Sequence, residues 1–189
     1  LRNIARQRDA LPIPDRETDL KRYLSVKYSM PEWIVDMWMK EYGGTRTEKL
    51  LEKLLDIHPV SLRFRSDLTP DQILELTERW QKSGVTLRRS ELCSTLYLAE
   101  NLESPAALPG YEEGWFLIQD ASSVLAVEAA GIRPGDTVMD ICAAPGGKSI
   151  LAAELTGEKG RVLSRDVSEK KVGLIEENRK RMGVRNQEI

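Results

Sequence analysis

Along the last third of the chain, short apolar runs alternate with apolar residues at helical spacing. The run at 138–141 is typical of a parallel strand that is covered on both faces. A Pro-Gly-Gly turn at 145–147 follows, and the pattern then becomes helical up to residue 155. A second run at 161–164 precedes a helix that extends from a Ser168 cap to about Met182.

The middle of the chain shows a different pattern. Residues 60–64 alternate like a strand, and Thr69 stands where a helix is expected to begin. Two further strand-like runs follow at 85–88 and 94–98. Strand, helix, strand and strand in this order predict a small α+β domain over residues 57–112.

The region before it, residues 1–56, is predicted to be helical. Residues 1–8 resemble the end of a helix, and a short helix is expected at about 18–26. Thr45 and Glu48 have the spacing of a capping box at the start of another helix. The helix between them is expected to bury one face made of Trp33, Ile34, Met37 and Trp38.

The region 113–189 is predicted to be the first part of a Rossmann-like domain. Asp120 is expected to cap a helix over 121–130, and the two strand–helix units described above follow it. Residues 187–189 have the position of a third strand. The whole chain is therefore predicted to be an α/β protein with a helical segment, a small α+β domain and a partial parallel sheet.

The turn at Cys142–Lys148 is the strongest candidate for a binding site. A ligand there would meet unpaired backbone N–H groups at a helix N-terminus. One chemistry that uses such a turn is the P-loop, but Cys142 stands in place of its first glycine. The other is the first turn of a Rossmann-like domain, where an acidic residue about 20 positions later binds the ribose. Asp166 lies 20 residues after Gly146, at the end of the second strand.

Two carboxylates flank this turn. Asp140 could accept a hydrogen bond from the ammonium group of a methionine tail, or it could bond to the loop itself. Asp166 is expected to hold the ribose, or otherwise to cap the helix that follows it. An acidic pair around a neutral turn favours S-adenosylmethionine over a nucleoside triphosphate, whose phosphates both carboxylates would repel.

The segment Asp140-Ile-Cys-Ala-Ala-Pro-Gly-Gly-Lys148 closely resembles the cofactor motif of the Sun/Fmu-type RNA cytosine-C5 methyltransferases, and most closely their bacterial RsmB-like branch. The segments 110–123 and 28–33 also resemble this family. The resemblance implies a class I methyltransferase fold, small-subunit ribosomal RNA as partner, and a ferredoxin- or RNA-recognition-like middle domain that helps to dock it. It also implies that S-adenosylmethionine is bound by Cys142, Ala143, Ala144, Pro145, Gly146, Gly147, Lys148 and Asp166.

The same resemblance places the catalytic nucleophile in a Pro-Cys motif on a later strand. A thiolate there would add to C6 of cytosine so that C5 can take the methyl group. The 189 residues contain no Pro-Cys pair, so no catalytic residue is assigned in this chain. Cys142 is expected to face strand packing, and Cys93 is expected to be a small core residue. The chain is expected to be the N-terminal fragment of such an enzyme and to be inactive alone.

Composition narrows the possible functions. The net charge of −2 is not the strongly basic balance of an obvious nucleic-acid binder, although local groups such as Arg63, Arg65, Arg88 and Arg89 could track phosphates or simply be solvated. Two distant cysteines and one histidine provide neither a disulfide framework nor a metal site. The sequence has no long apolar run and no signal peptide, which favours a cytoplasmic protein without membrane contact.

Two other classes of function remain open from the sequence. The first is a P-loop-like nucleotide-binding protein, which Cys142 and Asp166 oppose. The second is a non-catalytic RNA-binding or assembly protein that keeps the turn as a scaffold. The oligomeric state and the target nucleotide have no signal in the sequence.

Overall fold

The computed structural model describes residues 13–56 and 58–189, which belong to two compact units divided after His58. The helix predicted at 1–8 lies outside the described residues. In the part of the chain that is described, no helix is long and apolar enough to cross a membrane. The two units are described separately below.

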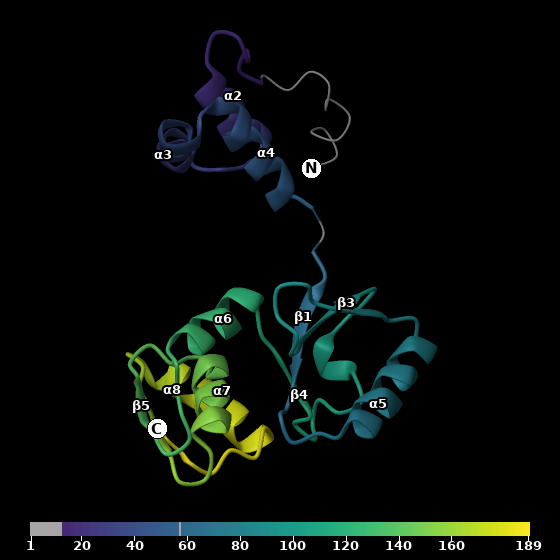
Figure 1. The fold of residues 1–189 in the computed structure, drawn as a ribbon. Helices are drawn as coiled ribbons and strands as arrows, with labels where there is room; N and C mark the ends of the chain where they lie inside the picture. The colour runs from purple at the N-terminus through teal and green to yellow at the C-terminus, as the bar shows by residue number, and fades with distance from the viewer. Residues whose placement is uncertain (1–12, 57) are drawn as a thin grey trace. The chain divides into compact units, whose positions relative to one another are not determined.

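The described part of the first unit is helical, as predicted. Its helices pack around Leu24, Tyr28, Val35 and Leu51, each of which is buried. Glu48 pairs with Arg16 and with Lys27 across the unit. The helices are α2 (Leu20–Lys27), α3 (Glu32–Tyr42) and α4 (Gly44–Leu54) (Figure 1).

One prediction for this unit is correct only in part, and another is wrong. Trp38 packs against the core as predicted, but Trp33 and Met37 are 68% and 51% exposed. The fully buried residue of α3 is Val35. The apolar residues of α3 extend around more than one face, and packing against α2 and α4 selects the face of Val35. The capping box at Thr45 is also wrong, because Gly43 at φ 76° is the N-cap and α4 begins one residue before Thr45.

The second unit begins with a four-stranded antiparallel sheet in the order β2-β3-β1-β4. Its helix α5 starts with a capping box in which the Thr69 side chain accepts a hydrogen bond from the Gln72 amide. Phe64, Trp80 and Phe116 form the aromatic centre of the core between α5 and the sheet. The elements are β1 (Val60–Phe64), α5 (Pro70–Lys82), β2 (Thr86–Arg89), β3 (Leu96–Glu100) and β4 (Phe116–Ile118).

Strand β4 pairs with β1, so the run after Trp115 extends the four-stranded sheet beyond residue 112. The chain then enters α6 (Ala121–Ala129), where the Asp120 side chain accepts from the Ser122 amide as the predicted N-cap. Val124 and Val127 of α6 pack in a second core with Leu96 of β3. Helix α6 therefore joins the two sheets of this unit.

The second sheet is parallel, in the order β5-β6-β7, which confirms the predicted alternation of strands and helices. Ser168 caps α8 as predicted, since its side chain accepts from the Lys171 amide. The elements are β5 (Thr137–Asp140), α7 (Gly147–Thr156), β6 (Arg161–Ser164), α8 (Glu169–Arg181) and β7 (Gln187–Glu188) (Figure 1).

The prediction that the first of these strands is covered on both faces is wrong. Val138 packs with α6 and α7, but Met139 is 64% exposed and Ile141 is 69% exposed. Alternate side chains of a strand point to opposite faces, and α6 and α7 cover only the face that carries Val138 and Val162. The apolar run therefore predicted the strand but not its environment.

Candidate functional site

The turn between β5 and α7 places the N-terminus of a helix at the carboxyl ends of the strands of the parallel sheet. Gly146 is the N-cap of α7 at φ 109°, a conformation that favours glycine, and the cap has no side-chain hydrogen bond. The Gly146 amide donates to the Ala143 carbonyl at 2.6 Å, which closes the turn. The first N–H groups of a helix have no intrahelical acceptor, so this end of α7 suits an anionic group.

Asp166 lies beside this turn, as the sequence predicted. Its carboxylate accepts from the Ala144 amide at 3.0 Å and from the Val167 amide at 2.8 Å, and it pairs with Lys171 at 3.3 Å. The Ala144 amide contributes most to holding the pKa of the Asp166 carboxyl below its usual range, followed by the Val167 amide. The side chain is only 5% exposed. Because the ionised carboxylate accepts from the Ala144 amide, it fixes the turn to the end of β6.

The alternative prediction that Asp166 caps α8 is wrong, because Ser168 is the N-cap. Asp140 bonds to its own loop, which was one of its two predicted roles. It accepts from the Cys142 amide at 3.3 Å and from the Ser149 hydroxyl at 2.7 Å. Because Ser149 is buried in the first turn of α7, this contact ties the helix to the end of β5.

The predicted set of turn residues is divided between core and surface. Ala143 is buried and donates to the Arg165 carbonyl at 3.0 Å, which ties the turn to the chain just beyond β6. Lys148 is exposed. Cys142 is exposed too, so the prediction that its side chain faces strand packing is wrong. The strand ends at Asp140, and Cys142 therefore lies in the turn rather than in the sheet.

Both roles predicted for Arg63, contact with phosphate or a solvated surface position, are wrong. Its side chain is 2% exposed and forms two hydrogen bonds with Glu154, at 2.8 and 3.0 Å. Arg65 pairs with Asp67, and Arg88 lies 3.9 Å from Glu100. Cys93 is buried, as expected. The described residues include no cluster of side chains that could hold a metal ion.

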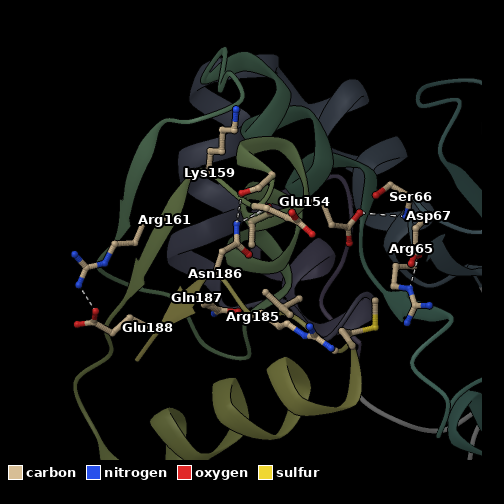
Figure 2. A pocket seen from close by; sticks show the side chains of 17 residues that line it. Arg65, Ser66, Asp67, Glu154, Lys159, Arg161, Arg185, Asn186, Gln187 and Glu188 are labelled. Carbon is tan, nitrogen blue, oxygen red and sulfur yellow. Dashed lines mark hydrogen bonds and ion pairs between the residues drawn. The ribbon is translucent and has the colours of Figure 1, made fainter.

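Two cavities lie at opposite ends of the strands of the parallel sheet. The smaller, of about 560 Å³, is a shallow groove lined by Asp166, Val167 and the first turns of α8. The larger, of about 1130 Å³, lies at the amino ends of β6 and β7 (Figure 2). Asn186 in that cavity donates to the Ala153 and Gly157 carbonyls, each at 2.9 Å, and Arg161 pairs with Glu188. The smaller groove is the one that adjoins the turn.

Comparison with known proteins gives a family and a fold. Residues 127–189 match the model of the 16S rRNA methyltransferase RsmB/F family. The chain is 34% identical over 179 residues to the probable ribosomal RNA small subunit methyltransferase B of Bacillus subtilis, covering 94% of this chain and 39% of that protein. It is 33% identical over 189 residues to the ribosomal RNA small subunit methyltransferase B of Enterobacter sp., covering 98% of this chain and 41% of that protein.

Solved structures agree with these sequence matches. PH0851 superposes with a TM-score of 0.79 at 26% identity, over 94% of this chain and 40% of that one. NSun6 from Pyrococcus horikoshii, solved with SFG, superposes with a TM-score of 0.71 over 81% of this chain and 63% of that one. At 17% identity the latter shows the fold alone. The chain spans about 40% of the length of the curated relatives, and the matches confirm the resemblance seen in the turn motif.

Proposed function

We infer that this chain belongs to the RsmB/F family of RNA methyltransferases, and we propose that it forms the cofactor-binding and RNA-docking parts of such an enzyme. The proposed reaction is methylation of cytosine C5 in small-subunit ribosomal RNA, with S-adenosylmethionine as the methyl donor. The names of the relatives support the RNA substrate. The observation that carries the proposal is the contact between Asp166 and the turn at Ala144, which joins both parts of the expected cofactor site.

The geometry around the turn fits the two ends of the proposed cofactor. The methionine carboxylate suits the N-terminus of α7, where no side chain caps the helix. The ribose hydroxyls suit Asp166, because Oδ2, which accepts from the Ala144 amide, has a second lone pair. The other oxygen, Oδ1, accepts from the Val167 amide and pairs with Lys171. Val167 is 86% exposed and lines the adjoining groove, so it offers an apolar surface to an adenine ring. The proposed site comprises the turn Cys142–Lys148 together with Asp166.

The four-stranded sheet is the proposed RNA-docking domain. Its order β2-β3-β1-β4, with α5 after β1, is consistent with a ferredoxin-like arrangement. Phe64 and Phe116 are buried against Trp80 in the core under α5, so they do not form an open stacking surface for bases. We therefore propose that this domain docks RNA through shape and backbone contacts.

The proposed catalytic thiolate is not assigned to Cys142 or Cys93. Cys142 belongs to the turn that would hold the cofactor, and Cys93 is buried beside Thr95, with their side chains 3.1 Å apart. The chain has only these two cysteines, and neither follows a proline. The chain alone is accordingly expected to bind the cofactor without transferring its methyl group.

Isothermal titration of S-adenosylhomocysteine into the purified chain tests the proposed site. Binding is expected for this ligand and not for ATP with magnesium. Binding of ATP with magnesium alone would instead support the P-loop alternative. Transfer of tritium-labelled methyl groups to RNA cytosine by this chain would overturn the assignment of the nucleophile outside it.

A further inference from the structure

Two carbonyl groups of the turn are held by side-chain amides from elsewhere in the second unit. Asn178 of α8 donates through Nδ2 to the Pro145 carbonyl at 2.9 Å. Gln119, between β4 and α6, donates through Nε2 to the Gly147 carbonyl at 3.1 Å. Both sides of the turn therefore have a donor that no local motif supplies.

Gln119 connects the turn to β1. It is 4% exposed, and its Oε1 accepts from Arg63 Nε at 2.7 Å. The other nitrogens of Arg63 bind Glu154, which lies two turns further along the same helix α7. Arg63 thus contacts α7 through Glu154 directly and through Gln119 indirectly.

Asn178 connects the turn to the segment before β4. Its Oδ1 accepts from Arg181 Nη2 at 3.1 Å. Arg181 Nη1 donates to the carbonyls of Tyr111 and Phe116 at 2.8 and 3.1 Å, and the guanidinium lies 4.1 Å from the centre of the Tyr111 ring. The end of α8 is therefore fixed to the four-stranded domain.

The two connections have the same hydrogen-bonding pattern, from an arginine to a side-chain amide and from the amide to a carbonyl of the turn. An arginine can only donate, so it orients the amide oxygen toward itself and the NH₂ group toward the turn carbonyl. A neutral side-chain amide can accept from arginine through its oxygen and donate to a carbonyl through its NH₂ group at once. A carboxylate of the same shape would accept from the arginine but could not donate to the turn.

We propose that Gln119 and Asn178 are positioning residues that hold the turn in its ligand-binding shape, and that the four-stranded domain acts on the cofactor site through them. The proposal rests on the proposed function for the identity of the ligand. The contacts themselves do not depend on it. A domain that docks RNA would then also fix the geometry of the site where the methyl donor binds.

The variants Gln119→Glu and Asn178→Asp test this, because each keeps the acceptor for arginine and removes the donor to the turn. Gln119→Met tests whether the charge of the new carboxylate matters. Gln81→Glu makes the same chemical change at an exposed position of α5 and serves as the matched control. Hydrogen exchange of the amides of 142–147 is measured without ligand, together with the unfolding midpoint and the dissociation constant for S-adenosylhomocysteine.

Each of the three variants is expected to speed exchange in 142–147 and to weaken binding about fivefold, the value of one neutral hydrogen bond. The half-buried Asn178→Asp should keep an unfolding midpoint close to that of Gln81→Glu, whereas the two Gln119 variants should lower it, because the donor to the Gly147 carbonyl is lost at a buried position. Unchanged exchange and binding in all three would overturn the proposal, as would losses in Asn178→Asp that merely follow a lower midpoint. If neither the original chain nor any variant binds S-adenosylhomocysteine, the proposed function fails. The exchange rates would still decide whether Gln119 and Asn178 hold the turn in place.

Discussion

The Asp166 carboxylate accepts a hydrogen bond from the Ala144 amide, 22 residues earlier, at 3.0 Å. One side chain therefore shapes the turn and also stands where the ribose of the proposed cofactor would lie. An alanine variant at this position removes both roles together. Substitutions that separate them are more informative.

The variant Asp166→Asn retains an oxygen that can accept from Ala144, but it loses the negative charge and one acceptor oxygen. We expect it to keep the fold and to weaken S-adenosylhomocysteine binding about tenfold or more, since hydrogen bonds to charged groups are worth more than neutral ones. Isothermal titration measures this. Asp166→Ala should bind more weakly still and exchange faster at Ala144. Equal affinity in Asp166→Asn and the original chain would exclude the carboxylate as a ribose ligand.

Asp166 should also contribute to the stability of the second unit in a pH-dependent way. Its pKa is lowered in the folded chain, chiefly by the Ala144 amide, relative to an unfolded value of about 3.9. The stabilisation is therefore complete above the unfolded pKa and is lost as the pH falls through the folded pKa. Urea unfolding of the original chain and Asp166→Asn should show a difference at pH 7 that shrinks below about pH 4. A stability difference between the two chains that stays constant from pH 7 down to about pH 2.5 would contradict this pH dependence.

Gly114 lies against the end of α8, where a Cβ atom would come within 1.9 Å of the Arg181 carbonyl oxygen. Gly131 has almost the same φ, 64° against 66°, but a Cβ there would meet nothing within 4 Å. Gly131→Ala should cost about 1–2 kcal/mol of unfolding free energy for the left-handed backbone alone. Gly114→Ala should cost clearly more, because the backbone must also move. Equal costs in chemical denaturation would mean that the two segments separate easily.

The Arg63–Glu154 pair joins β1 to α7, with the side chains 2% and 11% exposed. Arg63→Met should lower the unfolding free energy by about 3 kcal/mol or more, because Glu154 keeps a buried charge without its partner. Adding Glu154→Leu should recover part of this loss, since replacing both charges removes the unpaired one. Denaturant titration of the single and double variants measures the coupling, and a double variant less stable than Arg63→Met would argue against this explanation.

Much of the second unit could be predicted from sequence because its signals are local. The strand–helix alternation, the glycine turn at 145–147 and the caps at Thr69, Asp120 and Ser168 each depend on a few neighbouring residues. The position of Asp166 followed from its spacing relative to the turn. Such features need no knowledge of the tertiary structure.

The errors arise where packing between distant segments decides whether a side chain is buried and which group it contacts. The burial of Arg63 depends on Glu154, 91 residues later, and no periodicity indicates that partner. Gln119 and Asn178 bind backbone carbonyls, which leave no trace in the side-chain pattern. Gln119 comes directly after the apolar residues Leu117 and Ile118, and it is buried. A polar residue that continues an apolar run was the one signal in the sequence for its role.

The two thiols should differ sharply in reactivity, which tests the corrected position of Cys142. Cys142 is exposed in the turn, whereas Cys93 is 5% exposed and its thiol is 3.1 Å from the Thr95 hydroxyl. One equivalent of a thiol-alkylating reagent should therefore modify Cys142 in the folded chain, and Cys93 should react only on unfolding. Saturating S-adenosylhomocysteine should slow the reaction of Cys142 about tenfold, if the ligand covers the turn at a concentration roughly ten times its dissociation constant. Mass spectrometry of the alkylated peptides reads out both sites, and Cys142→Ser identifies the fast phase. Rapid labelling of Cys93 in the folded chain would contradict its burial. Labelling of Cys142 that the ligand does not slow would show that the turn is not the binding surface described above.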